Sequence, residues 1–203
     1  SIGAANSLLH SSLHYQNQLR EEDRNDFVNA LKIAIARTEH LSAFMKSFAD
    51  IVRLPQPAKQ PVDLKSMLGE LCAFMNMEAV KRSIRLRFEA TYPGPAVREI
   101  DRHQMEQVFV NILKNAMEAI GEEGEITVRL ERKGPGVLIS VEDSGTGIRP
   151  EVKHLLFTPF FSTKETGQGI GLTLVQEILS HHRFEFNLDG DPGGPTRFTI
   201  YIP

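Results

Sequence analysis

Three prolines within seven residues, at positions 55, 57 and 61, divide this chain into two parts. Proline fixes φ and lacks a backbone N–H, so no regular helix can run through this segment. The sequence therefore predicts a linker at residues 55–62, with one domain before it at 1–54 and a second after it at 63–203. The second part is long enough to enclose a hydrophobic core.

The part before the prolines has the spacing of two antiparallel helices. Apolar residues alternate at intervals of four and three from Phe27 to Val52, with Thr38 filling one gap, which is the pattern of a heptad seam. A shorter apolar pattern over residues 2–13 precedes it, and the polar run 20–23 would connect the two helices. Because a hairpin alone buries such a seam poorly, we expect a homodimeric four-helix bundle. The alternative is a hairpin folded onto its own globular domain.

Beyond the prolines, short apolar runs alternate with amphipathic helices. Asp101 can cap a helix, with Gln104 three residues on as in a capping box. Strands grouped in hairpins between helices favour an α+β fold, a two-layer α/β sandwich, over a doubly wound parallel sheet. The expected helices are 24–53, 64–82, 101–120 and 170–182, and the expected strands are 84–89, 126–130, 137–141, 184–188 and 198–202.

Composition excludes several classes of function. Acidic residues number 26 against 23 basic ones, whereas a protein that binds nucleic acid through its phosphates would normally be basic. No apolar run approaches the roughly 20 residues that a membrane-spanning helix needs. The one cysteine, Cys72, cannot form an internal disulfide and points to a reducing compartment.

Four clusters of residues could bind a ligand, and the first is a polar helix face. The expected helix 101–120 carries amide and carboxylate side chains along one side, at Gln104, Gln107, Asn111, Asn115 and Glu118. A solvated face would favour Lys, Arg and Glu, which are better helix formers than Asn. Amide oxygens one turn apart suit Mg²⁺, which prefers hard oxygen ligands and also binds substrate phosphates.

The other three clusters lie in expected turns and loops. Residues 143–147 read Asp-Ser-Gly-Thr-Gly after an apolar strand, which suits hydrogen bonding to an exocyclic amine and close approach to a flat ring, or simply a tight turn. Residues 156–164 contain three phenylalanines and end on Lys164. This is typical of a loop anchored at a site by aromatic side chains, or of a connecting loop that only packs its apolar residues inward. Residues 167–172, Gly-Gln-Gly-Ile-Gly-Leu, would expose backbone N–H groups to an anion at a helix start.

In this order and spacing, the four clusters resemble the ATP-binding domain of the GHKL superfamily. The resemblance is specifically to sensor histidine kinases of the nitrogen-regulation-type branch. Residues 111–116 look like their N box, 143–147 like the first glycine box, 157–161 like the F box and 167–171 like the second glycine box. The part before the linker is similar to the second half of a dimerisation and histidine-phosphotransfer hairpin, and 63–203 to the catalytic domain, which has the Bergerat fold.

This resemblance implies the catalytic core of a two-component signal-transduction kinase. Such an enzyme binds ATP and Mg²⁺ and transfers the γ-phosphoryl group to a histidine, and onward to a response-regulator aspartate. Asp143 would hold the adenine amino group, Asn115 would ligate Mg²⁺ with Asn111 close by, and Lys164 would meet the terminal phosphates. The implied nucleotide-binding residues are Asn111, Asn115, Asp143, Gly145, Gly147, Phe157, Phe160, Thr163, Lys164, Gly167, Gly169, Ile170, Gly171 and Leu172.

The chain departs from the family pattern in two places. The family's acceptor histidine is followed by an acidic residue, but His10 and His14 are not, and Ser1 opens a segment that looks like the one after the acceptor. The acceptor is therefore expected upstream of Ser1, so this chain alone is not expected to phosphorylate itself. Glu118 stands where many sensor kinases have a cation, and the sequence leaves its role open.

The resemblance also implies partners, and it leaves three alternatives for function. Expected partners are a second copy, bound through the hairpin, and the receiver domain of a response regulator, with no nucleic acid. The expected location is cytoplasmic, with any membrane anchor outside this chain. The alternatives are a GHKL ATPase, which would need a glutamate where Asn111 stands, a GHKL protein-serine kinase, and a nucleotide-binding dimerising scaffold, or pseudokinase.

Overall fold

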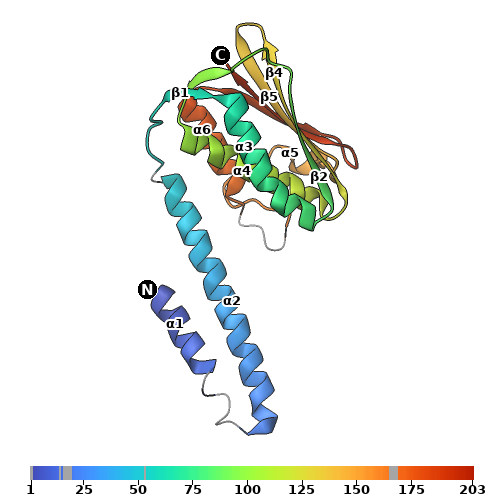
Figure 1. Cartoon of the computed structure of the whole chain (residues 1–203). Coiled ribbons are helices and arrows are strands. Elements are labelled where there is room, and N and C mark those ends of the chain that lie inside the picture. Colours follow the sequence, from blue (N-terminus) through green and yellow to red (C-terminus); the bar gives the residue numbers. More distant parts are fainter. Residues whose placement is uncertain (1, 14, 16–19, 53, 165–168) are drawn as a thin grey trace. The chain divides into compact units, whose positions relative to one another are not determined.

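The computed structural model of the chain describes residues 2–13, 15, 20–52, 54–164 and 169–203. It divides into two compact units, Ser1–Arg53 and Leu54–Pro203. The first unit is a helical hairpin, and the second is a mixed β-sheet with helices packed on it (Figure 1).

The hairpin consists of the short helix α1 (Ile2–Leu13) and the much longer helix α2 (Glu21–Val52). The two run antiparallel (Figure 1), as the sequence predicts. The seam residues that are half-buried are Phe27, Leu31, Ala34 and Thr38. Leu41 and Met45, further along the seam, remain 48% exposed, and the side chains at 48 and 52 lie outside the described set. The hairpin by itself therefore leaves part of the predicted seam open to solvent.

The second unit is built on a five-stranded sheet with the strand order β2-β4-β5-β7-β6. The strands are β2 (Ile84–Ala90), β4 (Gly124–Lys133), β5 (Gly136–Asp143), β6 (Glu185–Gly190) and β7 (Thr196–Ile202). β2 pairs with β4 in parallel, and the remaining pairs are antiparallel. Each predicted strand is present with its bounds shifted by a few residues, and the predicted α+β sandwich is confirmed.

Three helices cover one face of this sheet: α3 (Leu64–Lys81), α4 (Arg102–Ile120) and α6 (Gly171–His182) (Figure 1). Alternate residues of the central strands point toward them, as in Ile126, Val128 and Leu130 of β4, which are fully buried. Burying a side chain of this kind contributes roughly 1.5–3 kcal/mol. The sheet–helix interface is therefore the hydrophobic core, and it fixes α4 and α6 in place.

A second, two-stranded sheet was not predicted. β1 (Gln60–Asp63) pairs antiparallel with β3 (Val97–Ile100), so residues 60–62 of the expected linker form a strand. Four residues that include Pro61 give too short a pattern to recognise. Asp63 ends β1, and its Oδ1 accepts hydrogen bonds from the N–H of Lys65 (3.2 Å), which caps α3, and of Ala96 (2.8 Å). A further short helix, α5 (Pro150–Lys153), was not predicted either.

The start of α4 differs in one respect from the predicted capping box. Oδ1 of Asp101 accepts from the N–H of Gln104 (3.0 Å), as expected of an N-cap. The side chain of Gln104 is buried and does not reach back to the cap: its Nε2 donates to the carbonyl oxygen of Pro55 (2.9 Å). Oδ2 of Asp101 accepts from the N–H of Ala58 (2.9 Å). Residues 55–58 are thus fastened to the start of α4.

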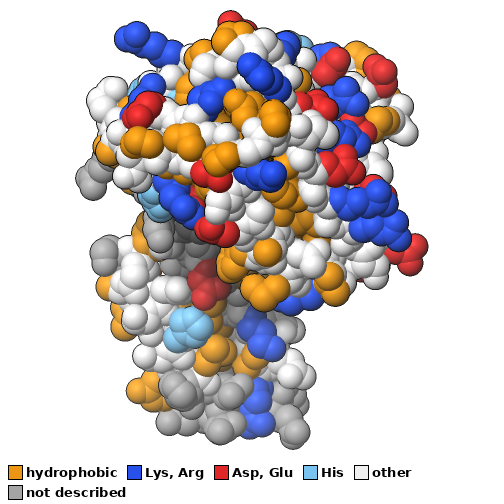
Figure 2. Space-filling model, turned by 45° about the horizontal axis from the view of Figure 1, so that its top comes forward, with side chains coloured by type: hydrophobic (Ala, Val, Ile, Leu, Met, Phe, Trp, Pro, Cys, Tyr) orange, Lys and Arg blue, Asp and Glu red, His pale blue; other side chains and the backbone are white. Residues whose placement is uncertain are grey.

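The face of the sheet away from the helices carries charges of both signs. Arg129 donates to Glu89 (3.0 Å) and lies 3.7 Å from Glu142, so the pairs bridge three strands. On the face shown in Figure 2, basic and acidic side chains are likewise interspersed. Among the described residues, no helix is both long enough and apolar enough to cross a membrane.

Candidate nucleotide-binding site

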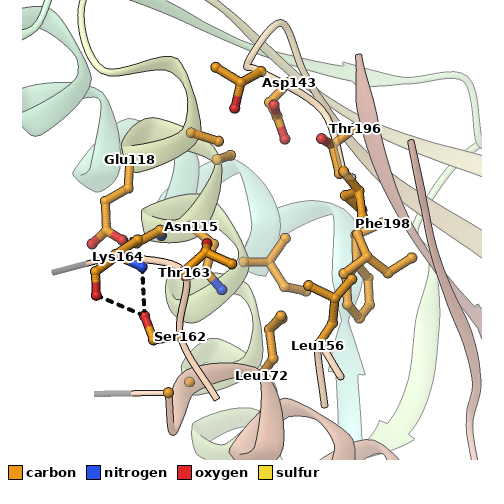
Figure 3. A pocket seen from close by; sticks show the side chains of 18 of the residues that line it. Asn115, Glu118, Asp143, Leu156, Ser162, Thr163, Lys164, Leu172, Thr196 and Phe198 are labelled. Carbon is orange, nitrogen blue, oxygen red and sulfur yellow. Dashed lines mark hydrogen bonds and ion pairs between the residues drawn. The ribbon is translucent and has the colours of Figure 1, made fainter. Parts of the chain in front are cut away.

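A cavity of about 540 Å³ is bounded by α4, by β5 and β7, by the loop before α5, and by the segment that connects α5 to α6. That volume lies within the range of roughly 300–1,000 Å³ typical of small-molecule sites. Asp143 and Thr196 lie at one end of the cavity, and Asn115, Glu118 and Lys164 lie on another side (Figure 3). The predicted residues that line it are Asn115, Asp143, Gly147, Thr163, Lys164, Gly169, Ile170, Gly171 and Leu172.

Four predicted residues lie beside the cavity and do not line it: Asn111, Gly145, Phe157 and Phe160. Gly167 lies outside the described residues. The structure therefore brings most of the predicted set to one place, although these residues come from four separate segments of the chain.

Asp143 is a buried carboxyl group at the end of β5. Burial raises its pKa to about 6, and the neighbouring Glu142 acts in the same direction. Oδ1 accepts a hydrogen bond from the N–H of Gly145 (2.9 Å), which fixes the carboxyl group at the cavity wall. A buried group of this kind, costly unless it is hydrogen-bonded, is well suited to accept from an amine of a bound ligand.

Gly145 and Gly147 are required by the packing of the loop after β5. A Cβ on Gly145 would lie 2.8 Å from the backbone of Ala119 at the end of α4. Gly147 has φ +73°, and a Cβ there would lie 1.8 Å from the carbonyl oxygen of Asp191 in the β6–β7 turn. The same turn is tied to this loop because the N–H of Gly193 donates to the carbonyl oxygen of Thr146 (2.8 Å). Glycine therefore lets two segments close around the end of the cavity.

The two asparagines of α4 have different surroundings. Asn115 lines the cavity, one turn before Glu118. Asn111 donates from Nδ2 to the carbonyl oxygen of Gln107 (2.8 Å), and its Oδ1 lies 3.0 Å from the position a Cβ on Gly171 would take. Asn111 therefore lies against the start of α6, and Asn115 is the asparagine placed to meet a ligand.

The phenylalanines of residues 157–161 are divided between packing and exposure. The ring of Phe157 packs edge-on against Phe186 of β6, with centroids 5.5 Å apart. Phe160 is 51% exposed and has φ +67°, which is uncommon for a residue that is not glycine. Its N–H donates to the carbonyl oxygen of Gly169 (2.9 Å). Phe161, which the sequence did not single out, is the phenylalanine of this loop that lines the cavity.

The start of α6 faces the cavity. Gly169 has φ +64°, and a Cβ there would lie 2.5 Å from the backbone of Phe160, so only glycine allows these two loops to meet. The N-cap residue, Ile170, makes no side-chain hydrogen bond to the first turn. Among the described residues, Ile170 therefore leaves the first N–H groups of α6 uncapped, and the positive end of the helix dipole there favours an anion.

Lys164 is paired across the cavity with Glu118. Its Nζ forms an ion pair with Oε2 of Glu118, and both residues line the cavity (Figure 3). Oxygen ligands for a divalent cation could come from Asn115 and from the phosphates of a nucleotide, which is how Mg²⁺ is usually held. The described residues contain no group of three His, Cys, Asp or Glu side chains that could hold a metal on their own. This donor set fits Mg²⁺ bound together with a nucleotide.

Sequence reasoning missed several lining residues, of which Thr196 is the most informative. It lies directly opposite Asp143 in the register of β5 and β7, and so shares that end of the cavity. The signal is a pairing between two strands that are far apart in the chain. Local motifs carry no such information.

Comparison with known proteins establishes the family. Residues 100–203 match the family model described as histidine kinase-, DNA gyrase B- and HSP90-like ATPase. The match covers half of the chain and contains the whole lining of the cavity. This chain belongs to that family of ATPases.

Curated relatives include proteins named as kinases. Sensor histidine kinase ZraS of Klebsiella oxytoca is 35% identical over 175 residues, which is 85% of this chain and 38% of ZraS. Sporulation kinase A of Bacillus subtilis is 28% identical over 190 residues, which is 87% of this chain and 31% of that kinase. The chain thus spans less than two fifths of the length of these relatives.

Solved structures agree on the fold. The nucleotide-free catalytic domain of histidine kinase ThkA is 30% identical, with a TM-score of 0.65, and the match covers 71% of this chain and 95% of that domain. ThkA in complex with response regulator protein TrrA matches 100% of this chain and 58% of that one, with a TM-score of 0.72. At 23% identity, that second likeness concerns the fold alone.

Proposed function

We propose that this chain is the catalytic core of a two-component sensor histidine kinase of the nitrogen-regulation-type branch. It would bind Mg-ATP and transfer the γ-phosphoryl group to a histidine nitrogen, for delivery to a response-regulator aspartate. The observation that carries the proposal is the single cavity with two chemically different regions. One holds the buried carboxyl group of Asp143, and the other combines Asn115, Lys164 and the open start of α6. The likeness to ZraS and ThkA supports the same assignment.

The end with Asp143 would bind adenine. The carboxyl group would accept a hydrogen bond from the exocyclic amine, which adenine has and guanine lacks at the corresponding position. Gly145 and Gly147 let the loop after β5 pack closely against the end of α4 and the β6–β7 turn, which holds the wall around Asp143 in place beside the base. This arrangement would select adenine nucleotides.

The opposite region would bind the phosphates. The N–H groups of the first turn of α6 would bind phosphate oxygens, Asn115 would ligate Mg²⁺, and Lys164 would contact the terminal phosphates. When bound, Mg²⁺ would neutralise charge on the β- and γ-phosphoryl oxygens. Phosphoryl transfer needs little covalent chemistry from the protein, so holding the nucleotide in line with the acceptor would supply most of the rate.

A second candidate is hydrolysis by an ATPase of the same superfamily, and the surroundings of Asn111 count against it. A general base must accept a proton from the attacking water. The Asn111 amide cannot do so, and its Nδ2 is already committed to the carbonyl oxygen of Gln107. We therefore expect slow hydrolysis and favour transfer to a protein histidine.

The acceptor and the partners follow from the same proposal. None of the seven histidines is followed directly by an acidic residue, so we do not assign the acceptor to any of them. The open part of the seam on α2 supports a homodimer, and the ThkA–TrrA complex supports a response-regulator receiver domain as a further partner. We place the site in the cytoplasm, where ATP is available.

Labelled-phosphate transfer tests the proposal. This chain and a chain extended upstream are each incubated with Mg²⁺ and γ-labelled ATP. We expect label on the extended chain that acid removes and alkali does not, because a protonated phosphoramidate loses its phosphoryl group readily. Acid-stable label would indicate a serine kinase. Rapid release of phosphate without protein labelling would indicate an ATPase, and either result would overturn the proposal.

A further inference from the structure

The lysine expected to meet the phosphates is already engaged. Nζ of Lys164 pairs with Oε2 of Glu118, which lies one turn after Asn115 on α4 (Figure 3). The backbone around Lys164 forms a local turn, in which the N–H of Lys164 donates to Oγ of Ser162 (3.1 Å). Glu118 and Lys164 are 46 residues apart in sequence, so this contact joins the loop to the helix that carries Asn115.

The charge balance of the cavity is unfavourable for a free polyanion. The charged residues of the described lining are Glu118, Asp143 and Lys164. Two carboxyl groups therefore face one ammonium group, which is itself paired. A nucleoside triphosphate without metal carries several negative charges, and like charges a few ångströms apart near a protein surface repel one another, although salt screens part of the effect. Glu118 would oppose such a ligand both by repelling its phosphates and by retaining Lys164.

We propose that Glu118 makes nucleotide binding conditional on a divalent cation. Without the cation, the carboxylate repels the phosphates and competes with them for Lys164. With it, the positive charge of the metal offsets the carboxylate, and Lys164 exchanges its partner Glu118 for a phosphate oxygen. Glu118 thereby sets the preference of the site for metal-bound over metal-free nucleotide. This inference rests on the nucleotide site proposed above and assigns it a specificity-determining residue.

The geometry distinguishes this role from that of an ordinary solvated charge on a helix. Glu122 also carries a carboxylate near the end of α4, but it is exposed and does not line the cavity. Glu118 lines the cavity and pairs with the one lysine of the described lining. The effect of removing the charge should therefore depend on position, and Glu122 provides the matched control.

The experiment compares ATP affinity with and without metal. The dissociation constant of ATP is measured by calorimetric titration of the 203-residue chain, once in excess Mg²⁺ and once in EDTA. The variants are Glu118→Gln, the control Glu122→Gln, and Lys164→Met. The quantity of interest is the ratio of the metal-free to the Mg²⁺ dissociation constant.

We expect Glu118→Gln to tighten metal-free ATP by roughly three- to tenfold, with little gain for Mg-ATP, so that the ratio falls. Glu122→Gln should leave the ratio unchanged. Lys164→Met should weaken both forms while the ratio stays at least as large as in the unaltered chain, because Glu118 remains.

Two results would overturn the inference, and they are distinguishable. If the unaltered chain binds ATP but Glu118→Gln keeps the same ratio, the role of Glu118 is wrong while the nucleotide site stands. If the unaltered chain binds ATP in neither condition, the proposed function fails, and this inference fails with it.

Discussion

The ring of His182, at the end of α6, accepts a hydrogen bond from the backbone N–H of Asp101, the residue that caps α4 (3.1 Å). Since Nε2 accepts, Nδ1 carries the proton, and it lies 2.8 Å from the carbonyl oxygen of Ile178. Nζ of Lys59 donates to the carbonyl oxygen of His182 (3.1 Å). The buried imidazole of His182 thus joins the end of α6 to the start of α4, and the backbone carbonyl of the same residue holds the segment that precedes β1.

Stability should fall in mild acid because of this histidine. Burial lowers the pKa of His182 below its ordinary value of 6.5, and Lys59 and His181 act in the same direction. The unfolded chain then binds the proton more readily, so the contribution of His182 to stability is full above pH 6.5 and decreases as the pH falls toward the lowered pKa. Asp143, whose pKa is raised to about 6, changes stability in the opposite direction over part of this range. The slope due to His182 is therefore measured by denaturant unfolding between about pH 5 and 8, as the difference between the unaltered chain and a variant without this histidine.

His182→Phe is the variant that isolates the effect. It should lose two buried hydrogen bonds, which costs about 1–3 kcal/mol at about pH 8, and its stability should depend less on pH. The matched control is His154→Asn, at an exposed position, which should keep the full dependence. An unaltered slope in His182→Phe would show that another group is responsible.

Gly147→Ala should destabilise the chain more than its backbone conformation alone explains. Gly94 has φ +72° and open space, with no atom within 4 Å, where a Cβ would lie, whereas a Cβ at Gly147, with φ +73°, would overlap the carbonyl oxygen of Asp191. Gly94→Ala should cost about 1–2 kcal/mol from the left-handed conformation, and Gly147→Ala clearly more. If Gly94→Ala and Gly147→Ala lower the denaturant midpoint equally, the close contact between Gly147 and Asp191 does not contribute to stability.

Asp143→Asn should stabilise the chain at neutral pH. The pKa of the carboxyl group is raised to about 6, from an ordinary value of 3.8, so the folded state disfavours the ionised form. The stabilisation that comes from keeping this carboxyl group protonated in the folded state is therefore fully present below pH 3.8 and is lost as the pH rises through 6. Asparagine removes the charge, so it should raise the free energy of unfolding by roughly 1–3 kcal/mol at about pH 8 and change it little at about pH 4. Unfolding at both pH values measures this, and equal gains at both would argue against a buried carboxylate.

The exposed stretch of α2 should mediate self-association. Leu41 and Met45 lie on the predicted seam and are 48% exposed in the single hairpin. Leu41→Glu should therefore shift sedimentation at micromolar concentration from dimer to monomer, whereas Lys32→Glu, at another exposed position of α2, should not. If the unaltered chain sediments as a monomer at this concentration, the proposed dimer is wrong.

The sequence predicted the parts of this fold that local patterns encode. Periodicity located the five strands of the main sheet, and the glycine clusters located the loops around the cavity. It did not reveal β1 and β3, because strands of four residues, one with a proline, carry almost no alternation. Gln104 was expected on a ligand-binding face, but it is buried and holds Pro55, a contact between residues 49 positions apart.

The same limit applies to the site. Thr196 and Phe161 line the cavity because of strand register and loop conformation, which are set by tertiary packing. The pairing of Lys164 with Glu118 is equally non-local. Motifs thus located the site, and the three-dimensional structure showed which charges face one another within it.

Nucleotide binding is tested most directly by calorimetric titration with ATP in excess Mg²⁺, for the unaltered chain and for Asp143→Asn. Because the variant is expected to be the more stable protein, loss of binding cannot be attributed to unfolding. We predict saturable binding at one site in the unaltered chain and at least about tenfold weaker binding in the variant, which lacks the carboxylate acceptor. Equal affinity in the two proteins, or no binding by the unaltered chain, would contradict the proposal that this cavity holds Mg-ATP.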